Sequence, residues 1–517
     1  MTAPYTADLG DGHYQNPILN ADYSDPDMIR VGDDYWMTAS SFAHAPGLPI
    51  LHSRDLVNWT LVNHALPALV PADHFATPRH GCGVWAPALR HHAGLFWIFY
   101  PDPDFGIHVI TATDPRGTWS APRLLKAGRG LIDPCPLWDD DGRAYLIHGW
   151  AKSRAGINNL LTLHEISPDA TTLLDEGRVV IDANLMPGWK TLEGPKLYKR
   201  EGWYWVFAPA GGVAEGYQAV FRSRDIHGPY EARNVLEQGS TPINGPHQGA
   251  WVETQAGEHW FCHFQEITAL GRVVHLQPMR WNEDGWPVMG HAPAGAQRGE
   301  PVLRHRKPAL PAQPICEPAS SDDFSAPRLG LQWQWEANPK PDWHSLTERP
   351  GRLRLRCQPL PPDGNLWASG HLLMQKLPAP TFTATTCLEF NPAAPGDSVS
   401  LIVFGYDYAS LGLHRTAQGL KLCLLRRLAA NKGGAEETLA VLDWDRPIAH
   451  LRLRLFPGRR CRFSHSRDGQ TWTELDHDFL VPSSHWVGAK VGLVASCSSG
   501  TPSGGFLDCE RFLMESS

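Results

Sequence analysis

A short motif recurs five times in residues 1–290 and constrains the fold more than any other feature of the 517-residue chain: a glycine or acidic turn followed by an aromatic strand. The aromatic residues that anchor the copies are between 49 and 61 residues apart: Tyr35, Phe96, Tyr145, Tyr204 and Trp260. A unit of this length holds about four short strands, which is the size of a propeller blade. A two-sheet sandwich would also contain many short strands, but without such a regular spacing. The repeat therefore predicts a five-bladed β-propeller.

The pattern changes after residue 290. Residues 306–320 are rich in proline and alanine, which is typical of a linker. Further on, leucine and arginine alternate strictly in residues 352–356 and 451–455, as expected for strands with one buried and one solvated face. We therefore expect an all-β chain: a five-bladed β-propeller catalytic domain at 1–305, the linker, and a jelly-roll or lectin-like antiparallel β-sandwich at 321–517.

Composition narrows the class of ligand. A net charge of −8 without a basic stripe argues against nucleic acid or an anionic membrane surface as partner. The 21 tryptophans favour flat, neutral ligands such as sugar rings. No apolar run approaches the ~20 residues of a membrane span. The first residues lack the basic start and apolar stretch of a signal peptide, and the ten cysteines form no CxxC pair, so we expect a cytoplasmic protein with reduced thiols.

Three carboxylates, Asp25, Asp133 and Glu193, each precede the aromatic anchor of a blade by 10 to 12 residues. Taken singly, an aspartate before proline is a common turn residue. Equivalent places on successive blades, however, lie at the same height around the central channel. Three carboxylates in one ring repel one another, which costs free energy of folding unless the protein uses the repulsion to shift a pKa. Hydrolysis of a glycosidic bond needs a carboxylate base and a protonated acid, and a third carboxylate can raise the pKa of that acid.

The motifs of the N-terminal three-fifths also follow one another in a recognisable order. They are Asn16-Pro17-Ile18-Leu19, Asp25-Pro26-Asp27, residues 40–42, residues 52–59, residues 83–87, Asp133-Pro134, Glu193-Gly194-Pro195, residues 244–249 and residues 275–278. In this order they resemble glycoside hydrolase family 43, the five-bladed propeller β-xylosidases and α-L-arabinofuranosidases.

The resemblance implies separate roles for the three acids. Asp25 would be the general base, Glu193 the general acid, and Asp133 the residue that tunes and orients the acid. The family inverts the anomeric centre in one step, so base and acid should lie ~6.5–9.5 Å apart to admit a water molecule. The first motif departs from the family, because Ser24 and Asp27 stand where many members read Pro-Asp-Pro-Ser; we interpret Asp27 as structural.

Four further residues are candidate substrate contacts. The resemblance implies that Arg272 supports the acid and contacts a sugar hydroxyl, whereas the sequence alone fits a surface arginine after a glycine turn equally well. Phe42 and Trp85 resemble pocket walls for a pentose ring, although aromatic residues in blades more often belong to the core. Trp150 is a weaker candidate of the same kind.

His247 is the candidate metal ligand. The histidine at the matching position of similar enzymes lies on the propeller axis and can hold a calcium ion whose other ligands are mainly water. Because calcium prefers oxygen ligands, such a site would be unusual, and a hydrogen-bonded structural histidine is the alternative. His263 and His275 are further candidates for lining this channel. The chemistry itself requires no cofactor, so calcium near His247 would have a structural or activating role.

We therefore expect an inverting exo-glycosidase that releases terminal xylose from short β-1,4-xylo-oligosaccharides. An α-L-arabinofuranosidase or a bifunctional enzyme is the alternative. A non-catalytic sugar-binding propeller is disfavoured, because all three acids are present. The retaining fructan-cleaving enzymes lack support, because no Arg-Asp-Pro triplet occurs, and mannoside phosphorylases would need a cationic cluster near these motifs. A homo-oligomer is compatible with the sequence. The sandwich should lend the pocket a loop, with turns near Trp367 and Tyr406 as candidates.

Overall fold

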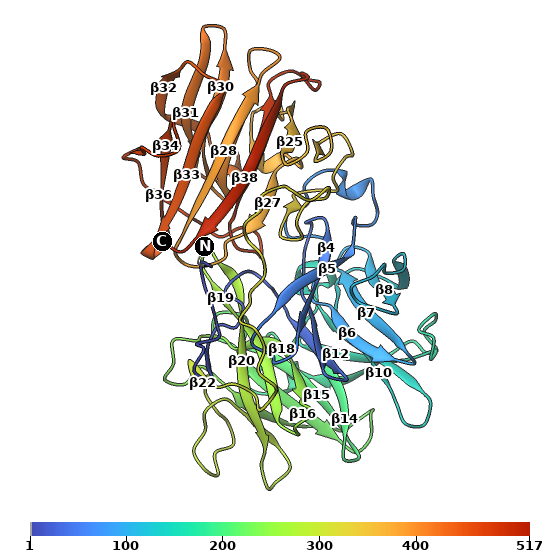
Figure 1. Ribbon diagram of the computed structural model, residues 1–517. Coiled ribbons are helices and arrows are strands. Elements are labelled where there is room, and N and C mark those ends of the chain that lie inside the picture. Colours follow the sequence, from blue (N-terminus) through green and yellow to red (C-terminus); the bar gives the residue numbers. More distant parts are fainter. Residues whose placement is uncertain (1–2) are drawn as a thin grey trace.

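The computed structural model describes residues 3–517, and its N-terminal part folds into five antiparallel sheets of four consecutive strands each (Figure 1). The strands, blade by blade, are β2 (Asp27–Val31), β3 (Asp34–Thr38), β4 (Gly47–Ser53), β5 (Thr60–Leu66); β6 (Ala88–His92), β7 (Leu95–Asp102), β8 (Gly106–Ala112), β9 (Arg123–Ala127); β10 (Leu131–Trp138), β11 (Ala144–Trp150), β12 (Leu160–Ile166), β13 (Arg178–Asp182); β14 (Lys196–Arg200), β15 (Trp203–Ala210), β16 (Tyr217–Ser223), β17 (Glu231–Leu236); and β18 (His247–Glu253), β19 (His259–Ile267), β20 (Gly271–Trp281), β21 (Pro287–Met289). The predicted five-bladed propeller is confirmed.

The repeated turn of the sequence joins the first and second strand of every blade. Its glycine adopts the left-handed conformation in all five copies, with φ between 64° and 85°: Gly32, Gly94, Gly142, Gly202 and Gly257. Glycine occupies this region without the steric cost that other residues incur, so it closes each hairpin tightly. The aromatic anchor then enters the second strand and packs between neighbouring blades. The regular spacing in the sequence thus reflects one hairpin repeated around a ring.

The innermost strand of every blade is entered through an X-Pro step. The five steps are Asp25-Pro26, Ala86-Pro87, Asp133-Pro134, Gly194-Pro195 and Gly245-Pro246. In four blades the strand begins at the residue after this proline, and in the third blade β10 already includes the step. Since the innermost strands run in the same direction along the propeller axis, residues before the prolines gather at one end of the channel. The other end is built from the later residues of the same strands.

The ring closes by side-chain packing between the first and the last blade. Met28 of β2 and Ala250 of β18 belong to one buried cluster. A small sheet of β1 (His13–Gln15) and β22 (Arg304–Arg306) lies over this junction, and the hydroxyl of Tyr14 donates to the carbonyl oxygen of Leu276 on β20 at 2.8 Å. The two ends of the propeller sequence are thereby held together.

The C-terminal part is a sandwich of two eight-stranded sheets, which confirms the predicted β-sandwich (Figure 1). One sheet has the path β23 (Gln334–Trp335), β27 (Leu373–Lys376), β37 (Lys490–Cys497), β29 (Ser398–Phe404), β30 (Tyr408–Thr416), β31 (Gly419–Arg427), β32 (Glu436–Trp444), with β26 (Gln358–Pro359) beside β37. The other has β24 (His344–Ser345), β25 (Leu353–Arg356), β38 (Phe506–Glu515), β28 (Phe382–Asn391), β33 (Ile448–Phe456), β34 (Arg460–Ser466), β35 (Thr473–Glu474), with β36 (Phe479–Leu480) beside β34. Burial alternates residue by residue along β28, as the period of two predicts.

Helical segments in residues 3–517 are short: α1 (Lys152–Ala155) and the 3₁₀ turns η1 (His74–Ala76), η2 (Ala183–Leu185), η3 (Leu366–Ala368), η4 (Ala430–Lys432) and η5 (Pro457–Arg459). In this part of the chain we find no helix with the length and apolar character needed to cross a membrane.

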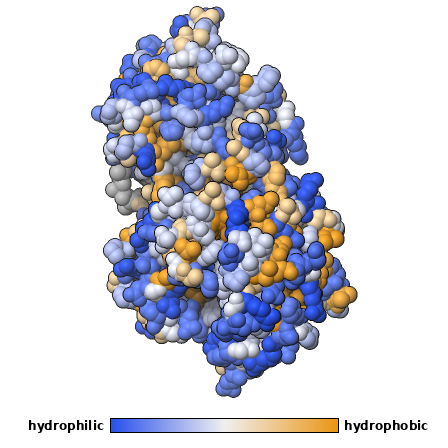
Figure 2. Space-filling view, turned by 90° about the vertical axis from the view of Figure 1, so that its right-hand side faces the viewer, coloured by the Kyte–Doolittle hydropathy of each residue, from blue (hydrophilic) through white to orange (hydrophobic). Residues whose placement is uncertain are grey.

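The two domains share one buried core. Ala269 and Leu270, in the turn between β19 and β20, belong to the same hydrophobic cluster as the sandwich interior. The backbone adds direct pairing, because Ala45 bridges to Trp335 and the amide of Ala489 donates to the carbonyl oxygen of Ala269 at 2.7 Å. Apolar residues on the face shown in Figure 2 gather around the level where the domains meet, while polar residues cover most of both ends. A shared core of this kind fixes one domain against the other.

Candidate active site

A pocket of about 210 Å³ opens at the end of the propeller channel where the X-Pro steps gather. Its lining residues are Asp25, Phe42, Trp85, Ala86, Ile132, Asp133, Thr191, Glu193, Gly212, Val213, His247, Gln248, Phe264, Arg272 and Trp486. The structure thus brings together the three predicted acids from three different blades. The volume lies below the ~300 Å³ at which pockets for drug-sized ligands begin, so it suits a single small ring.

Asp25 is held by donors on both carboxylate oxygens. The hydroxyls of Ser24 and Ser40 donate to Oδ2 at 2.8 and 2.5 Å. A guanidinium N–H of Arg272 donates to Oδ1 at 3.0 Å. Asp25 is only 4% exposed, so these bonds are shielded from water. The carboxylate is therefore fixed in one orientation, as a base that aligns a water molecule must be.

Asp133 is tied to the loop that carries Glu193. Its Oδ2 accepts a hydrogen bond of 2.7 Å from the backbone amide of Gly194. Burial raises the pKa of Asp133, and the negative charge of Asp25 adds to this, whereas the Gly194 bond and the charge of Lys196 act in the opposite direction. Asp133 thus holds the backbone next to Glu193 and so fixes the position of this glutamate in the pocket.

Glu193 has the environment of a carboxylic acid that keeps its proton. Burial raises its pKa, the negative charge of Asp133 raises it further, and Arg272 opposes the shift. The side chain is 29% exposed, toward the pocket opening. Unlike Asp25, its carboxyl group makes no hydrogen bond within the described residues, so it remains free to meet a ligand oxygen.

Strained backbone gathers around this pocket. Six lining residues other than glycine have a positive φ, between 42° and 65°: Asp25, Phe42, Asp133, Thr191, Gln248 and Trp486. Side chains rarely adopt this conformation, and it persists only where the surrounding structure imposes it. Asp25 and Asp133 share the same φ of 54° at the same X-Pro step of their blades. The concentration of such residues supports a functional role for this end of the channel.

The candidate substrate contacts fall into two groups. Phe42 and Trp85 both line the pocket, with ring centroids 6.4 Å apart. Arg272 also lines it and is 8% exposed, so it is not a surface arginine; its hydrogen bonds go to Asp25 and Ser24 rather than to Glu193. Trp150, at the end of β11, lies outside the lining. Its indole N–H donates to the hydroxyl of Thr162, and its ring packs against a blade core.

Gly212, Val213, Phe264 and Trp486 line the pocket although the sequence did not indicate them, and Trp486 differs from the others in its origin. It lies in the loop between β36 and β37 and is the one residue of the sandwich in the lining. Its ring centroid is 6.4 Å from that of Trp85, and the Arg272 guanidinium carbon lies 5.9 Å from its centre. The turns near Trp367 and Tyr406, expected to reach the pocket, instead lie behind this loop. Tyr406 contacts His485, and Trp367 stacks on His80 with ring centroids 3.7 Å apart.

A buried charge cluster stands behind the wall of the pocket: Glu336, His44, His80 and Lys490, named here the Glu336 cluster. The Glu336 carboxylate lies 2.9 Å from Lys490 Nζ, 3.2 Å from His44 Nε2 and 3.9 Å from His80 Nδ1. Burial alone would raise the pKa of Glu336, but Lys490 and His44 hold it well below its usual value. His44 lies in the propeller loop next to Phe42, so the sandwich carboxylate braces that wall segment. The Nε2–H of His80 donates instead to the carbonyl oxygen of Trp367 at 2.7 Å.

His247 follows the X-Pro step of the fifth blade, but its surroundings do not form a calcium site by themselves. Neither ring nitrogen makes a hydrogen bond in residues 3–517, and Nε2 lies 3.4 Å from a Glu193 oxygen. The same part of the chain holds no group of three His, Cys, Asp or Glu side chains that could share a metal ion. His263 and His275 stack on each other in β19 and β20, outside the pocket lining. The protein therefore offers one nitrogen, while calcium prefers a cage of oxygens.

Comparisons with known proteins identify the family of both domains. Residues 14–287 match the model of glycosyl hydrolases family 43, and residues 321–515 match the β-xylosidase C-terminal concanavalin A-like domain. A putative β-xylosidase of Xylanibacter ruminicola is 37% identical over 98% of this chain and 89% of its own length. A non-reducing end α-L-arabinofuranosidase of Bacteroides ovatus is 30% identical over 81% of this chain and 79% of its own. The crystal structure of xylan β-1,4-xylosidase from Bacillus halodurans C-125 superimposes with a TM-score of 0.86, at 27% identity, covering 97% of this chain and 99% of the other.

Proposed function

Since this chain belongs to glycosyl hydrolases family 43 and is a glycosidase, we propose that it is an inverting exo-β-xylosidase that releases terminal xylose from β-1,4-xylo-oligosaccharides. The observation that carries the proposal is the contrast between two carboxyl groups in one pocket. Asp25 is paired with Arg272, while Glu193 has a raised pKa and no hydrogen-bond partner among the described residues. When a cation holds one carboxyl group and the other keeps its proton, the first can act as the base and the second as the acid.

In the proposed reaction Asp25 accepts a proton from a water molecule as that water attacks the anomeric carbon. Glu193 donates its proton to the glycosidic oxygen, and the bond from this oxygen to the anomeric carbon breaks. The attack from the opposite face inverts the anomeric configuration in one step. Asp133 does not touch the reacting atoms; burial raises the pKa of Glu193 and the charge of Asp133 raises it further, so the acid keeps its proton, and the bond from Gly194 to Asp133 fixes the acid loop.

The shape of the pocket supports removal of one terminal sugar. The space of about 210 Å³ is bounded by Phe42 and Trp85 on the propeller and by Trp486 on the sandwich. A chain of sugars could not pass through a pocket closed on these sides, so only an end would enter. The names of the relatives and of the similar crystal structure support xylose as the sugar released.

Arabinose is the second candidate sugar. The similarity to an α-L-arabinofuranosidase favours an enzyme that also cleaves α-L-arabinofuranosides. Both pentoses would present hydroxyl groups to the same pocket. We therefore include bifunctional activity as the alternative proposal.

Two properties around this activity are also proposals. We place the enzyme in the cytoplasm, where reduced thiols persist, since all ten cysteines are free. We retain a calcium ion held mainly by water near His247 as a separate hypothesis, and no step of the reaction depends on it. A chelator followed by added calcium tests it: a reversible change in thermal stability that His247→Ala abolishes would support the ion, and an unchanged stability would exclude it.

The activity test compares turnover of p-nitrophenyl β-xyloside, p-nitrophenyl α-arabinofuranoside and xylobiose, with Glu193→Ala beside the wild type. We expect the variant to lose about 10²–10⁴-fold on xylobiose, because the leaving sugar oxygen then departs without a proton. The loss should be smaller on p-nitrophenyl β-xyloside, whose leaving group needs little protonation. NMR of the first product should show α-xylose. An undiminished rate on xylobiose would refute the acid assignment, and β-xylose as first product would refute inversion.

A further inference from the structure

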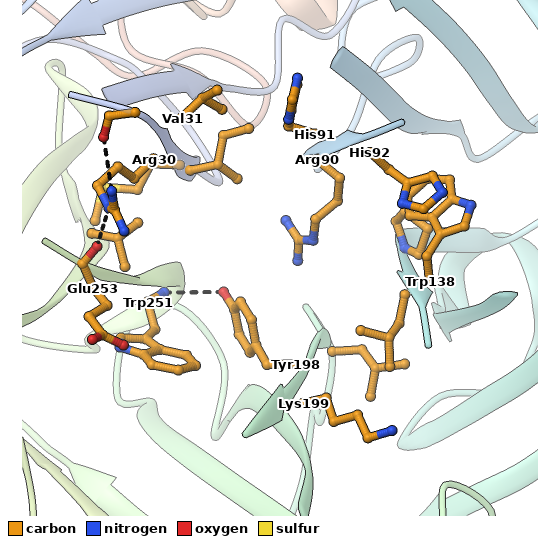
Figure 3. Close-up of a pocket in the computed structure, with 17 residues that line it drawn as sticks. Arg30, Val31, Arg90, His91, His92, Trp138, Tyr198, Lys199, Trp251 and Glu253 are labelled. Atoms are coloured by element: carbon orange, nitrogen blue, oxygen red, sulfur yellow. Dashed lines mark hydrogen bonds between the residues drawn. The ribbon is translucent and has the colours of Figure 1, made fainter. Parts of the chain in front are cut away.

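The opposite end of the propeller channel holds a second, larger cavity of about 620 Å³ (Figure 3). It is lined by the later residues of all five innermost strands: Met28, Ile29, Arg30, Val31, Gly32, Arg90, His91, His92, Pro136, Leu137, Trp138, Leu197, Tyr198, Lys199, Trp251, Val252 and Glu253. It shares no lining residue with the active-site pocket. The proposed reaction uses none of these side chains, so the cavity requires an explanation of its own.

The floor of this cavity presents hydrogen-bond donors. Arg90 and Tyr198 point into the open space (Figure 3). Arg90 has five N–H groups, and its bonds within the protein go to Asp27 Oδ2 at 2.8 Å, to the carbonyl of Leu89 at 2.6 Å and to Cys135 Sγ at 2.8 Å. Two of its N–H groups remain. The Tyr198 oxygen accepts a bond of 3.1 Å from the amide of Trp251, which leaves its own proton to donate.

The rim adds a second guanidinium group. Arg30 is exposed and donates to the carbonyl oxygens of Glu253 and Gly32 at 2.7 and 2.9 Å. Within residues 3–517 it has no carboxylate ion-pair partner. Lys199 differs, because Asp139 and Asp140 neutralise it. Glu253 is the single carboxylate among the lining residues.

The aromatic rings of the cavity are already engaged by the protein. Trp138 stacks on His92 with centroids 4.5 Å apart and 8° between the planes. Trp251 lies nearly parallel to Phe207, with centroids 6.0 Å apart. A neutral sugar binds chiefly by stacking on a free ring face, and these two rings already pack against other rings. The free N–H and O–H donors of the cavity therefore favour an anion over a neutral sugar.

We propose that this cavity, named here the distal cavity, binds a small oxyanion, the carboxylate or phosphate of a sugar-sized molecule, between Arg90 and Arg30. Planar guanidinium groups present paired donors that match carboxylate and phosphate oxygens, and such charge-assisted bonds are about twice as strong as neutral ones. The volume of about 620 Å³ admits a sugar acid or a sugar phosphate. The site stands apart from the glycosidase reaction, because it lacks the pair of carboxyl groups that the reaction needs.

Isothermal titration calorimetry of the full chain tests the proposal with three probes: inorganic phosphate, glucuronate and xylose. We expect saturable 1:1 binding of at least one anion, and about tenfold weaker binding by Arg30→Ala, since the variant loses one charge-assisted bond to the anion. Arg224→Ala is the matched control, because Arg224 is an exposed arginine outside the cavity that also donates only to a carbonyl oxygen. Binding of phosphate alone or of glucuronate alone identifies the source of the oxyanion.

Three results would overturn the proposal. The first is the absence of saturable binding by both anions. The second is anion binding that survives unchanged in both Arg30→Ala and Arg90→Lys. The third is competitive inhibition of xyloside hydrolysis by the same anion at the same concentrations, which would locate it in the active-site pocket. Because the readout is binding, its failure is distinct from failure of the proposed glycosidase activity.

Discussion

The two ends of the propeller channel use the same five strands for opposite purposes. At the active-site end the strands begin after X-Pro steps, and carboxyl groups gather in a small space of about 210 Å³ closed by a sandwich loop. At the distal end the same strands present guanidinium groups around an open space of about 620 Å³. The two ends differ in the charge of their side chains and in how far water reaches them. At the active-site end, burial and mutual repulsion raise the pKa values of Asp133 and Glu193. At the distal end, arginine side chains keep N–H donors that no protein group uses.

The contrast shows that a propeller blade fixes where a residue lies along the channel, but not which chemical group that residue carries. Asp25, Ala86 and Asp133 all stand at the same X-Pro step, and two of them are acids while one is a wall residue. The residues placed on this shared scaffold therefore decide the function of each end. Four predictions test that separation, beginning with the largest expected effect.

Asp25→Asn should lower kcat on xylobiose by about 10³-fold or more, because the amide cannot accept the proton of the attacking water. Glu253→Gln makes the same kind of change at the distal end and should leave kcat within about twofold. Steady-state kinetics of both variants measure this. Equal losses at the two ends would show that the channel works as one unit.

Asp133→Asn should shift the alkaline limb of the kcat profile to lower pH. The negative charge of Asp133 raises the pKa of Glu193, and activity is lost as pH rises through that pKa because the acid then lacks its proton. Without the charge this loss begins at lower pH. The asparagine oxygen can still accept the Gly194 bond, so structural damage should be small. A profile from about pH 5 to pH 9 provides the measurement, and an alkaline limb that stays in place would contradict the tuning role.

Trp486→Ala should raise KM for xylobiose about tenfold with a smaller change in kcat, since the ring bounds the pocket without touching the acids by hydrogen bonds. Trp472→Ala is the control, because Trp472 belongs to the same domain and packs under Arg452, away from the pocket. A matching rise in KM for the control would attribute the effect to the sandwich as a whole.

Glu336→Gln should raise KM a few-fold, with kcat nearly unchanged, because His44 loses the charge that braces the wall at Phe42. Lys490 would also lose its buried partner, so thermal stability should fall. Glu336→Asp, which retains the charge, should recover part of both properties. A drop in stability with KM unchanged would mean that the cluster only joins the domains.

Local chemistry explains what the sequence could predict. The glycine turns and aromatic anchors are contained within single hairpins, so five blades and the alternating strands of the sandwich follow from short stretches of chain. The acids were predicted to share one end of the channel because they share a place in the repeat. Even so, Glu193 lies one residue earlier than Asp25 and Asp133 relative to its X-Pro step.

Docking between domains explains what the sequence could not predict. Trp486 reaches the pocket only because the turn at Ala269 packs against the sandwich, and no local pattern records that contact. The partner of Arg272 depends likewise on where two blades close the ring. Trp150 follows a blade strand much as pocket residues do, but its indole N–H turns to Thr162 instead.

The position of Trp486 in the chain also sets the order in which the pocket is assembled in the cell. All three acids leave the ribosome before it, and Glu193 precedes it by 293 residues. The last propeller strand, β21, ends at Met289, 197 residues before Trp486. At translation rates of about 5–20 residues per second, the complete propeller therefore has roughly 10 to 40 seconds in which it can fold while its pocket lacks this wall. A nascent chain would thus carry its complete set of acids well before it can hold a sugar between Trp85 and Trp486, and catalysis would begin only when the later domain docks.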